Sequence, residues 1–142
     1  MAYLLDTNVI SELRRGLRCD PNVRRWVNAI PADELFISVL TLGEIRAGVE
    51  SKRRMDPVQA EAIERWLTLI TDDYAGRTFP VTTLEADRWG RIPLQGQMPD
   101  VDGVIAATAL VHGLTVATRN TTDFWRSGVP LVNPFEETAA HG

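Results

Sequence analysis

The hydrophobic positions of this chain fall into short apolar runs separated by longer stretches with helical spacing. The short runs predict strands at residues 3–5, 35–39, 78–81, 115–118 and 131–132. Between them, apolar residues recur every three or four positions and predict helices at residues 7–17, 21–30, 41–54, 57–74, 82–91, 102–112 and 121–126. This alternation predicts an α/β fold with a mostly parallel central sheet of about five short strands covered by helices.

Capping residues support the helix boundaries. In this interpretation Thr7 caps the first helix, Pro21 opens the second, and Gly113 ends the helix at 102–112. Two prolines and a glycine predict an irregular connection at residues 92–99. We expect one domain over residues 1–142, with a flexible tail from about residue 136.

Composition narrows the class of protein. The 142 residues are 44% hydrophobic, which is ordinary for a globular domain, and a single cysteine excludes a disulfide framework and a cysteine-based zinc site. No apolar run approaches the roughly 20 residues needed to span a bilayer, so we expect a cytoplasmic protein. The net charge of −4 argues against strong non-specific binding to nucleic acid.

The basic residues are nevertheless clustered. The clusters consist of Arg14, Arg15, Arg18, Arg24 and Arg25, then Arg46, Lys52, Arg53 and Arg54, and finally Arg119 and Arg126. Each cluster is either a solvated helix face or part of a basic rim around an acidic site, since arginine suits bidentate contacts to phosphate.

Four acidic residues carry the candidate chemistry: Asp6, Glu44, Asp102 and Asp123. Asp6 directly follows a predicted buried strand, and the strand at 115–118 leads toward Asp123. In parallel sheets, functional groups gather at the carboxyl ends of the strands. Carboxylates that meet there repel unless a cation holds them, and a hard divalent metal is the simplest such cation.

Each acid also has an ordinary interpretation. Asp6 could be a helix-cap acid, although a Thr7 cap would leave its side chain free. Glu44 could be a partly solvated helix residue, but the nearby Gly48 costs a helix about 1 kcal/mol and suggests close approach by another backbone or a ligand. Asp102 is favoured at a helix N-terminus by the macrodipole alone. We interpret Asp100 as a loop acid.

The order and spacing of these motifs resemble the PIN-domain family, in particular its VapC- and FitB-like ribonuclease toxins. The opening motif is LLDTNV around Asp6, the middle one is LTLGEIRAGV around Glu44, and the late one is DGVIAATAL from Asp102. The closing strand and turn resemble Val116–Asn120 followed by Asp123. The resemblance extends from Met1 to about residue 135.

The resemblance implies a small nuclease that hydrolyses RNA phosphodiesters with Mg²⁺ or Mn²⁺. By analogy Asp6, Glu44 and Asp102 would hold the metal directly or through water, with Asp123 in the catalytic set and Thr118 and Asn120 beside the ligands. Carboxylates and water are the ligands that suit Mg²⁺. The resemblance also implies a VapB-like antitoxin that occupies the groove, and a homodimer.

One position departs from the family pattern. The fourth acid of some relatives falls where this chain has Asn120, and Asp123 lies three residues further on. Either Asp123 completes the acidic cluster, or Asn120 contributes a neutral oxygen there.

Other functions fit less well. A receiver-like phospho-acceptor needs a lysine that reaches the phosphate, and the only lysine, Lys52, lies at a helix end far from the late strands. The two histidines, His112 and His141, are poorly placed for Ser-His-Asp or Cys-His hydrolysis, and a glycine-rich dinucleotide turn is missing. A non-catalytic scaffold with a relict acidic site is the remaining alternative.

Overall fold

The computed structural model describes residues 1–93 and 98–137. Its strands are β1 (Tyr3–Leu5), β2 (Leu35–Ser38), β3 (Thr78–Phe79), β4 (Thr115–Ala117) and β5 (Leu131–Val132). Its α-helices are α1 (Thr7–Leu13), α2 (Pro21–Asn28), α3 (Val39–Arg53), α4 (Pro57–Asp73), α5 (Thr83–Arg91), α6 (Asp100–His112) and α7 (Thr121–Phe124). Short 3-10 segments are η1 (Gly16–Arg18), η2 (Ala32–Glu34), η3 (Ala75–Arg77) and η4 (Trp125–Ser127).

The strands form one five-stranded sheet in the order β3-β2-β1-β4-β5, and each pair of neighbours is parallel. This confirms the predicted α/β fold. The first strand lies at the centre, so Leu5 pairs in register with Ala117 at the end of β4. The residues that follow β1 and β4 therefore emerge side by side at one edge of the sheet.

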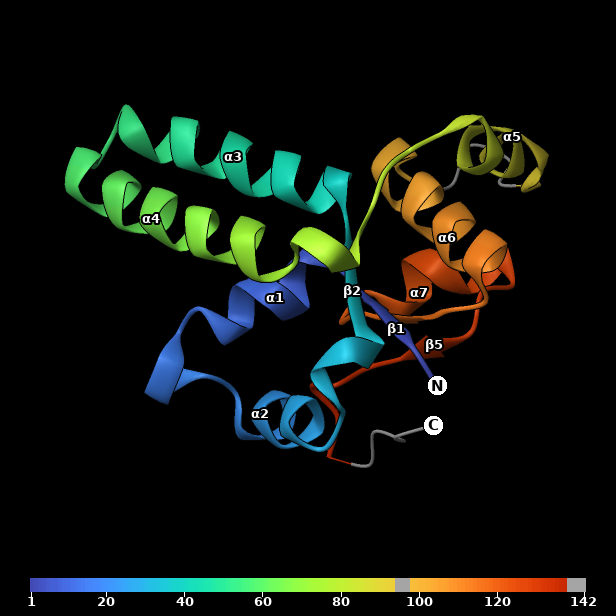
Figure 1. The fold of residues 1–142 in the computed structure, drawn as a ribbon, viewed down its shortest axis with the longest axis horizontal. Helices are drawn as coiled ribbons and strands as arrows, with labels where there is room; N and C mark the ends of the chain where they lie inside the picture. Colours follow the sequence, from blue (N-terminus) through green and yellow to red (C-terminus); the bar gives the residue numbers. More distant parts are fainter. Residues whose placement is uncertain (94–97, 138–142) are drawn as a thin grey trace.

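The alternation of side chains along β1 divides the core into two parts. Tyr3 and Leu5 face a cluster that includes residues of α1 to α4, and Leu4 faces a second cluster formed mainly with α6 and α7. Tyr3 also packs edge-on against Trp26 of α2, with the ring centroids 4.9 Å apart. Helices cover both faces of the sheet (Figure 1), as expected of a parallel sheet.

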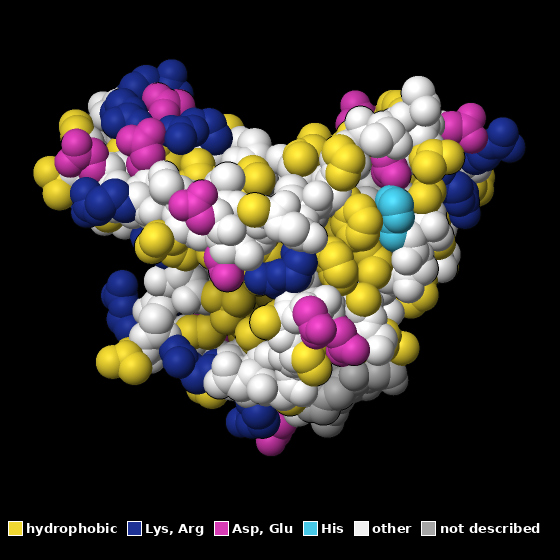
Figure 2. Space-filling model, in the orientation of Figure 1, with side chains coloured by type: hydrophobic (Ala, Val, Ile, Leu, Met, Phe, Trp, Pro, Cys, Tyr) yellow, Lys and Arg dark blue, Asp and Glu magenta, His cyan; other side chains and the backbone are white. Residues whose placement is uncertain are grey.

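The helices α3 and α4 run side by side as an antiparallel pair that extends beyond the sheet (Figure 1). Ion pairs join the two helices, because Arg46 and Arg53 of α3 both contact Glu64 of α4, at 2.5 and 3.2 Å. Figure 2 shows charges of both signs gathered over this pair. These two arginines therefore have a structural role between the helices.

Predicted and observed boundaries agree within two residues except at the first helix. That helix ends at Leu13, and Gly16 then adopts φ +60°, a conformation that glycine tolerates best. Leu17, predicted on the buried face, is 98% exposed as a result. The predicted connection at 92–99 and the tail from about residue 136 lie partly outside the described residues. Within the part of the chain that is described, no helix is long and apolar enough to cross a membrane.

The buried side chain of Glu85 links the start of α5 to the C-terminal end of α6 through hydrogen bonds. Its Oε1 atom accepts hydrogen bonds from the amide and hydroxyl of Thr82, both at 2.6 Å, which completes a capping box. Its Oε2 atom lies 2.9 Å from Nε2 of His112, whose ring stacks on Phe79. The Thr82 hydroxyl, the Thr82 amide and His112 together lower the pKa of Glu85 to about 2. His112 thus has a structural partner.

We expect Glu85→Gln to lower the free energy of unfolding at neutral pH by about 1–3 kcal/mol, because it weakens hydrogen bonds to a buried carboxylate. The folded-state pKa lies below the ordinary 4.5, so this stabilisation is present above pH 4.5 and is lost as the pH falls toward 2. Chemical denaturation of both proteins across this range measures the difference. The exposed Glu61→Gln serves as control, and equal stability of Glu85→Gln and wild type at neutral pH would contradict the assignment.

Candidate metal-dependent active site

Asp6 forms the buried centre of the site at the carboxyl edge of β1. Its carboxylate is 4% exposed and accepts hydrogen bonds from the amide of Thr7 at 2.9 Å, from Nδ2 of Asn8 at 3.1 Å and from the hydroxyl of Thr118 at 2.8 Å. The N-cap of α1 is Asp6 itself, so the predicted cap at Thr7 was wrong. All three donors are neutral, and they hold the side chain without cancelling its charge.

Thr118 and Asn8 join the ends of the two central strands. The fully buried Thr118 hydroxyl donates to Asp6 and accepts from the amide of Asn120 at 2.9 Å. The side chain of Asn8 reaches across to the same hydroxyl at 3.3 Å and accepts from the amide of Arg119 at 3.1 Å. Sequence reasoning placed Thr118 beside the site but missed Asn8. The available signal was its position two residues after the strand-end acid.

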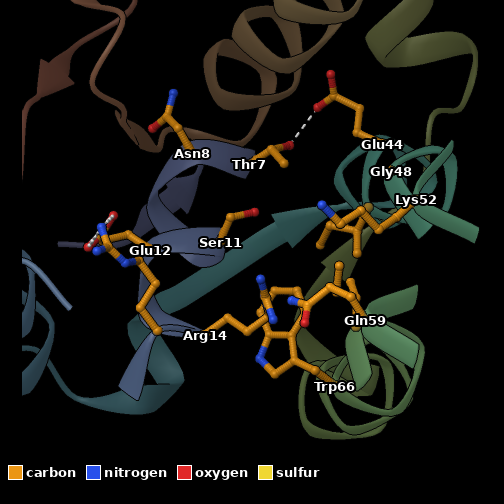
Figure 3. Close-up of a pocket in the computed structure, with 13 residues that line it drawn as sticks. Thr7, Asn8, Ser11, Glu12, Arg14, Glu44, Gly48, Lys52, Gln59 and Trp66 are labelled. Atoms are coloured by element: carbon orange, nitrogen blue, oxygen red, sulfur yellow. Dashed lines mark hydrogen bonds and ion pairs between the residues drawn. The ribbon is translucent and has the colours of Figure 1, made fainter. Parts of the chain in front are cut away.

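Glu44 approaches from α3 and contacts the first helix. Its Oε1 atom accepts a hydrogen bond of 2.5 Å from the hydroxyl of Thr7, as Figure 3 shows. Glu44 is exposed, and its charge raises the pKa values of both Asp6 and Asp102. Through this hydrogen bond, Glu44 links α3 to the start of α1, directly after Asp6.

Asp102 lies in the first turn of α6, which begins at Asp100, so the interpretation of Asp100 as a loop acid was wrong. Partial burial and, in decreasing order of effect, the charges of Asp6, Glu44 and Asp123 together raise the pKa of Asp102 to about 6. The charges of the three other predicted acids therefore all act on Asp102. Burial likewise raises the pKa of Asp6, against the opposing effect of its hydrogen bonds.

Asn120 and Asp123 follow β4 at the entrance to α7. Asn120 is the N-cap residue of this short helix, but its side chain makes no capping hydrogen bond. Asp123 is exposed in the first turn and contributes to the raised pKa of Asp102. The charge of Asp123 thus acts on Asp102, whereas Asn120 contacts the site through its backbone amide, which donates to the Thr118 hydroxyl.

The donor set suits a hard divalent cation. Within residues 1–93 and 98–137, no three acidic, histidine or cysteine side chains lie close enough to hold an ion by themselves. Mg²⁺ does not require such a cage, because it usually keeps several waters and binds through one or two carboxylates plus substrate phosphate. A buried, ionisable Asp6 beside an Asp102 with raised pKa provides such carboxylates, and a cation there would relieve their repulsion.

We expect Asp102→Asn to stabilise the metal-free protein by about 1 kcal/mol near neutral pH, a value reduced for solvent screening. The folded-state pKa of about 6 exceeds the ordinary 3.8, so the wild type is most stable below pH 3.8 with respect to this group and loses that stability as the pH rises through 6. The gain in the variant should therefore grow across this window. Denaturant titrations in EDTA measure it, and a gain that does not change with pH would show that Asp102 is not coupled to its neighbours.

Comparisons with known proteins agree with this geometry. The PIN domain family model matches residues 3–126. The chain is 34% identical over 142 residues to the VapC ribonuclease Y4jK of Sinorhizobium fredii, covering 94% of this chain and 97% of that protein.

Solved structures show the same fold. FitAcB from Neisseria gonorrhoeae superposes with a TM-score of 0.83 at 33% identity, covering 94% of this chain and 99% of that one. A toxin-antitoxin complex from Klebsiella pneumoniae matches with a TM-score of 0.71 at 26% identity, covering 95% and 99%. The acidic edge of the sheet, the match over residues 3–126 and the related structures show that this chain belongs to the PIN-domain family.

Proposed function

We propose that this protein is a metal-dependent endoribonuclease and the toxin of a toxin–antitoxin pair. The observation that carries the proposal is the geometry at the carboxyl end of the parallel sheet. There the buried Asp6 is held by neutral donors, and Glu44 accepts a hydrogen bond from the adjacent Thr7. A PIN-family relative named as a ribonuclease supports RNA as the substrate. We also propose that the protein acts in the cytoplasm, where cellular RNA is available as a substrate.

The site residues have two kinds of role, metal binding and the positioning of Asp6. Asp6, Asp102 and Glu44 would hold Mg²⁺ or Mn²⁺ directly or through water, with Asp123 as the outer acid. Such an ion, when bound, supplies a water of lowered pKa and offsets charge on the phosphoryl oxygens. Thr118 and Asn8 position the carboxylate of Asp6 through their hydrogen bonds.

We also propose that a small antitoxin protein binds over this site and blocks it. The support is the related structure of a toxin-antitoxin complex, together with the hydrogen-bond donors to Asp6 and Glu44, which are all neutral among the residues that the structure describes. An arginine from a partner would relieve the same repulsion that a metal relieves. A homodimer remains a prediction of the family resemblance.

Asp6→Asn and Asp102→Asn should each abolish RNA cleavage while the fold persists, because each replaces a charged ligand by a neutral side chain of the same shape. Cleavage of purified single-stranded RNA in Mg²⁺ or Mn²⁺, with EDTA as a blank, measures the effect. The exposed Asp33→Asn is the matched control. Wild-type activity in either site variant would refute the assignment, and cleavage by no form of the protein would favour a non-catalytic scaffold.

The ion itself should raise the thermal stability of the wild type. Binding to the folded state alone adds about 2.7 kcal/mol when its concentration is 100 times Kd. This increase should disappear in Asp102→Asn. The same shift in both proteins would place the ion elsewhere.

Asn120 and Asp123 can be separated by opposite substitutions. Asn120→Asp should tighten Mn²⁺ binding, because it adds a charge next to the amide that bonds Thr118. Asp123→Ala should lower activity less than Asp102→Asn, because Asp123 is exposed and acts on Asp102 through its charge. Calorimetric Mn²⁺ titrations of both variants test this, and unchanged affinity in Asn120→Asp would show that this side chain faces away from the site.

A further inference from the structure

A groove of about 480 Å³ leads away from the acidic cluster between α1, α3 and α4. Residues spaced three or four positions apart on each helix contribute to its wall (Figure 3). They include Thr7 and Ser11 on α1 with Arg14 directly after it, Glu44, Gly48 and Lys52 on α3, and Gln59, Ile63 and Trp66 on α4. The groove is thus built by the same helices that present Thr7 and Glu44 to the site.

The groove changes character along its length. At one end the hydrogen bond between Thr7 and Glu44 closes the wall beside the acids. Lys52 lies eight residues beyond Glu44 on the same face of α3, which is about 12 Å along the helix axis. Arg14 directly follows α1, seven residues beyond Thr7, so both cations lie at the end of the groove away from the cluster.

These two cations are available to a ligand. Neither Arg14 nor Lys52 has an ion pair or side-chain hydrogen bond within the described parts of the chain, whereas neighbouring Arg15 is paired with Glu12 at 3.3 Å. The same wall includes the side chain of Ile63 and the half-buried ring of Trp66. An unpaired cation beside an aromatic ring is the arrangement that binds single-stranded nucleic acid, through phosphate and base stacking respectively.

Gly48 keeps the middle of the groove open. A Cβ atom built there would meet nothing within 4 Å, so no neighbouring backbone requires this glycine. Of the two reasons that the sequence suggested for Gly48, close approach by another backbone is therefore wrong. Free space for a ligand is the one that the structure supports.

We propose that this groove binds the stretch of single-stranded RNA that continues from the cleaved bond, with Arg14 and Lys52 on its phosphates and Trp66 against a base. The proposal rests on the ribonuclease function above. Charge complementarity favours RNA here, since the far end of the groove is cationic in a protein of net charge −4. The cations of the groove then attract the RNA locally, which explains how a protein of negative net charge binds a polyanionic substrate.

The test is the binding of a fluorescein-labelled single-stranded RNA of mixed sequence to full-length protein in EDTA, measured by anisotropy at several salt concentrations. Arg14→Gln with Lys52→Gln should weaken binding roughly tenfold. The slope of log affinity against log salt should fall by roughly 0.7 for each lost phosphate contact. The double variant Arg54→Gln with Arg65→Gln is the matched control, since it removes the same charge. Arg54 directly follows α3 and Arg65 lies on α4; both side chains are exposed and lie outside the groove.

A second variant tests the space rather than the charge. Gly48→Leu should weaken RNA binding while thermal stability is maintained or increased, because leucine favours a helix more than glycine does. Wild-type RNA affinity and salt dependence in both groove variants would overturn the proposal and leave the groove to a protein occupant. Cleavage by the wild type in Mg²⁺ is measured in parallel: its absence contradicts the proposed function, whereas cleavage with unaltered binding by the variants contradicts only the groove.

Discussion

The buried charge of Asp6 is the constraint on which the site depends. A carboxylate that is 4% exposed normally needs a cationic partner. Asp6 instead has three neutral donors, from Thr7, Asn8 and Thr118, and they offset its desolvation without neutralising it. The negative potential therefore persists at the carboxyl end of the sheet. Partial burial of Asp102 and, next in effect, this potential raise the pKa of Asp102 to about 6. A divalent cation or a partner's arginine is the natural complement of this arrangement.

The fold produces this arrangement through the central position of β1. Its parallel pairing with β4 places the residues after Leu5 beside those after Ala117, so Asp6 and Thr118 meet although they are 112 residues apart. The hydrogen bond from Thr7 to Glu44 then ties α3 to the same edge. Because α4 packs against α3 through buried apolar residues and both helices line the groove with α1, the acidic site and the groove beside it form one continuous surface.

Much of this architecture could be predicted from the sequence. The alternation of short apolar runs with helical stretches was sufficient to predict the parallel sheet, and the position of Asp6 directly after the first strand was sufficient to place it at the carboxyl end of that sheet. These features depend on local patterns and on one rule about parallel sheets. The basic clusters could not be sorted in this way, since only tertiary contacts show that Arg53 bridges two helices while Lys52 next to it lines a groove.

The details that sequence reasoning missed all depend on individual side-chain contacts. The assignment of the cap to Asp6 rather than Thr7 follows from which oxygen faces the helix amides. The role of Asn8 requires the end of β4, which is distant in sequence. Glu85 reaches His112 across two helices, and no periodic pattern identifies such a pair. In each case a specific polar contact determines the role of the residue, and the spacing of hydrophobic residues does not predict that contact.

The most direct test of the account is the titration of the Asp102 carboxyl group, followed by carbon-13 NMR with and without Mg²⁺. In metal-free protein the midpoint should lie near pH 6, because partial burial and the three neighbouring acids disfavour the ionised form. Mg²⁺ should lower that midpoint, because a bound cation favours the carboxylate. A midpoint near 3.8 that Mg²⁺ does not change would contradict the claim that these acids form one coupled, cation-binding cluster.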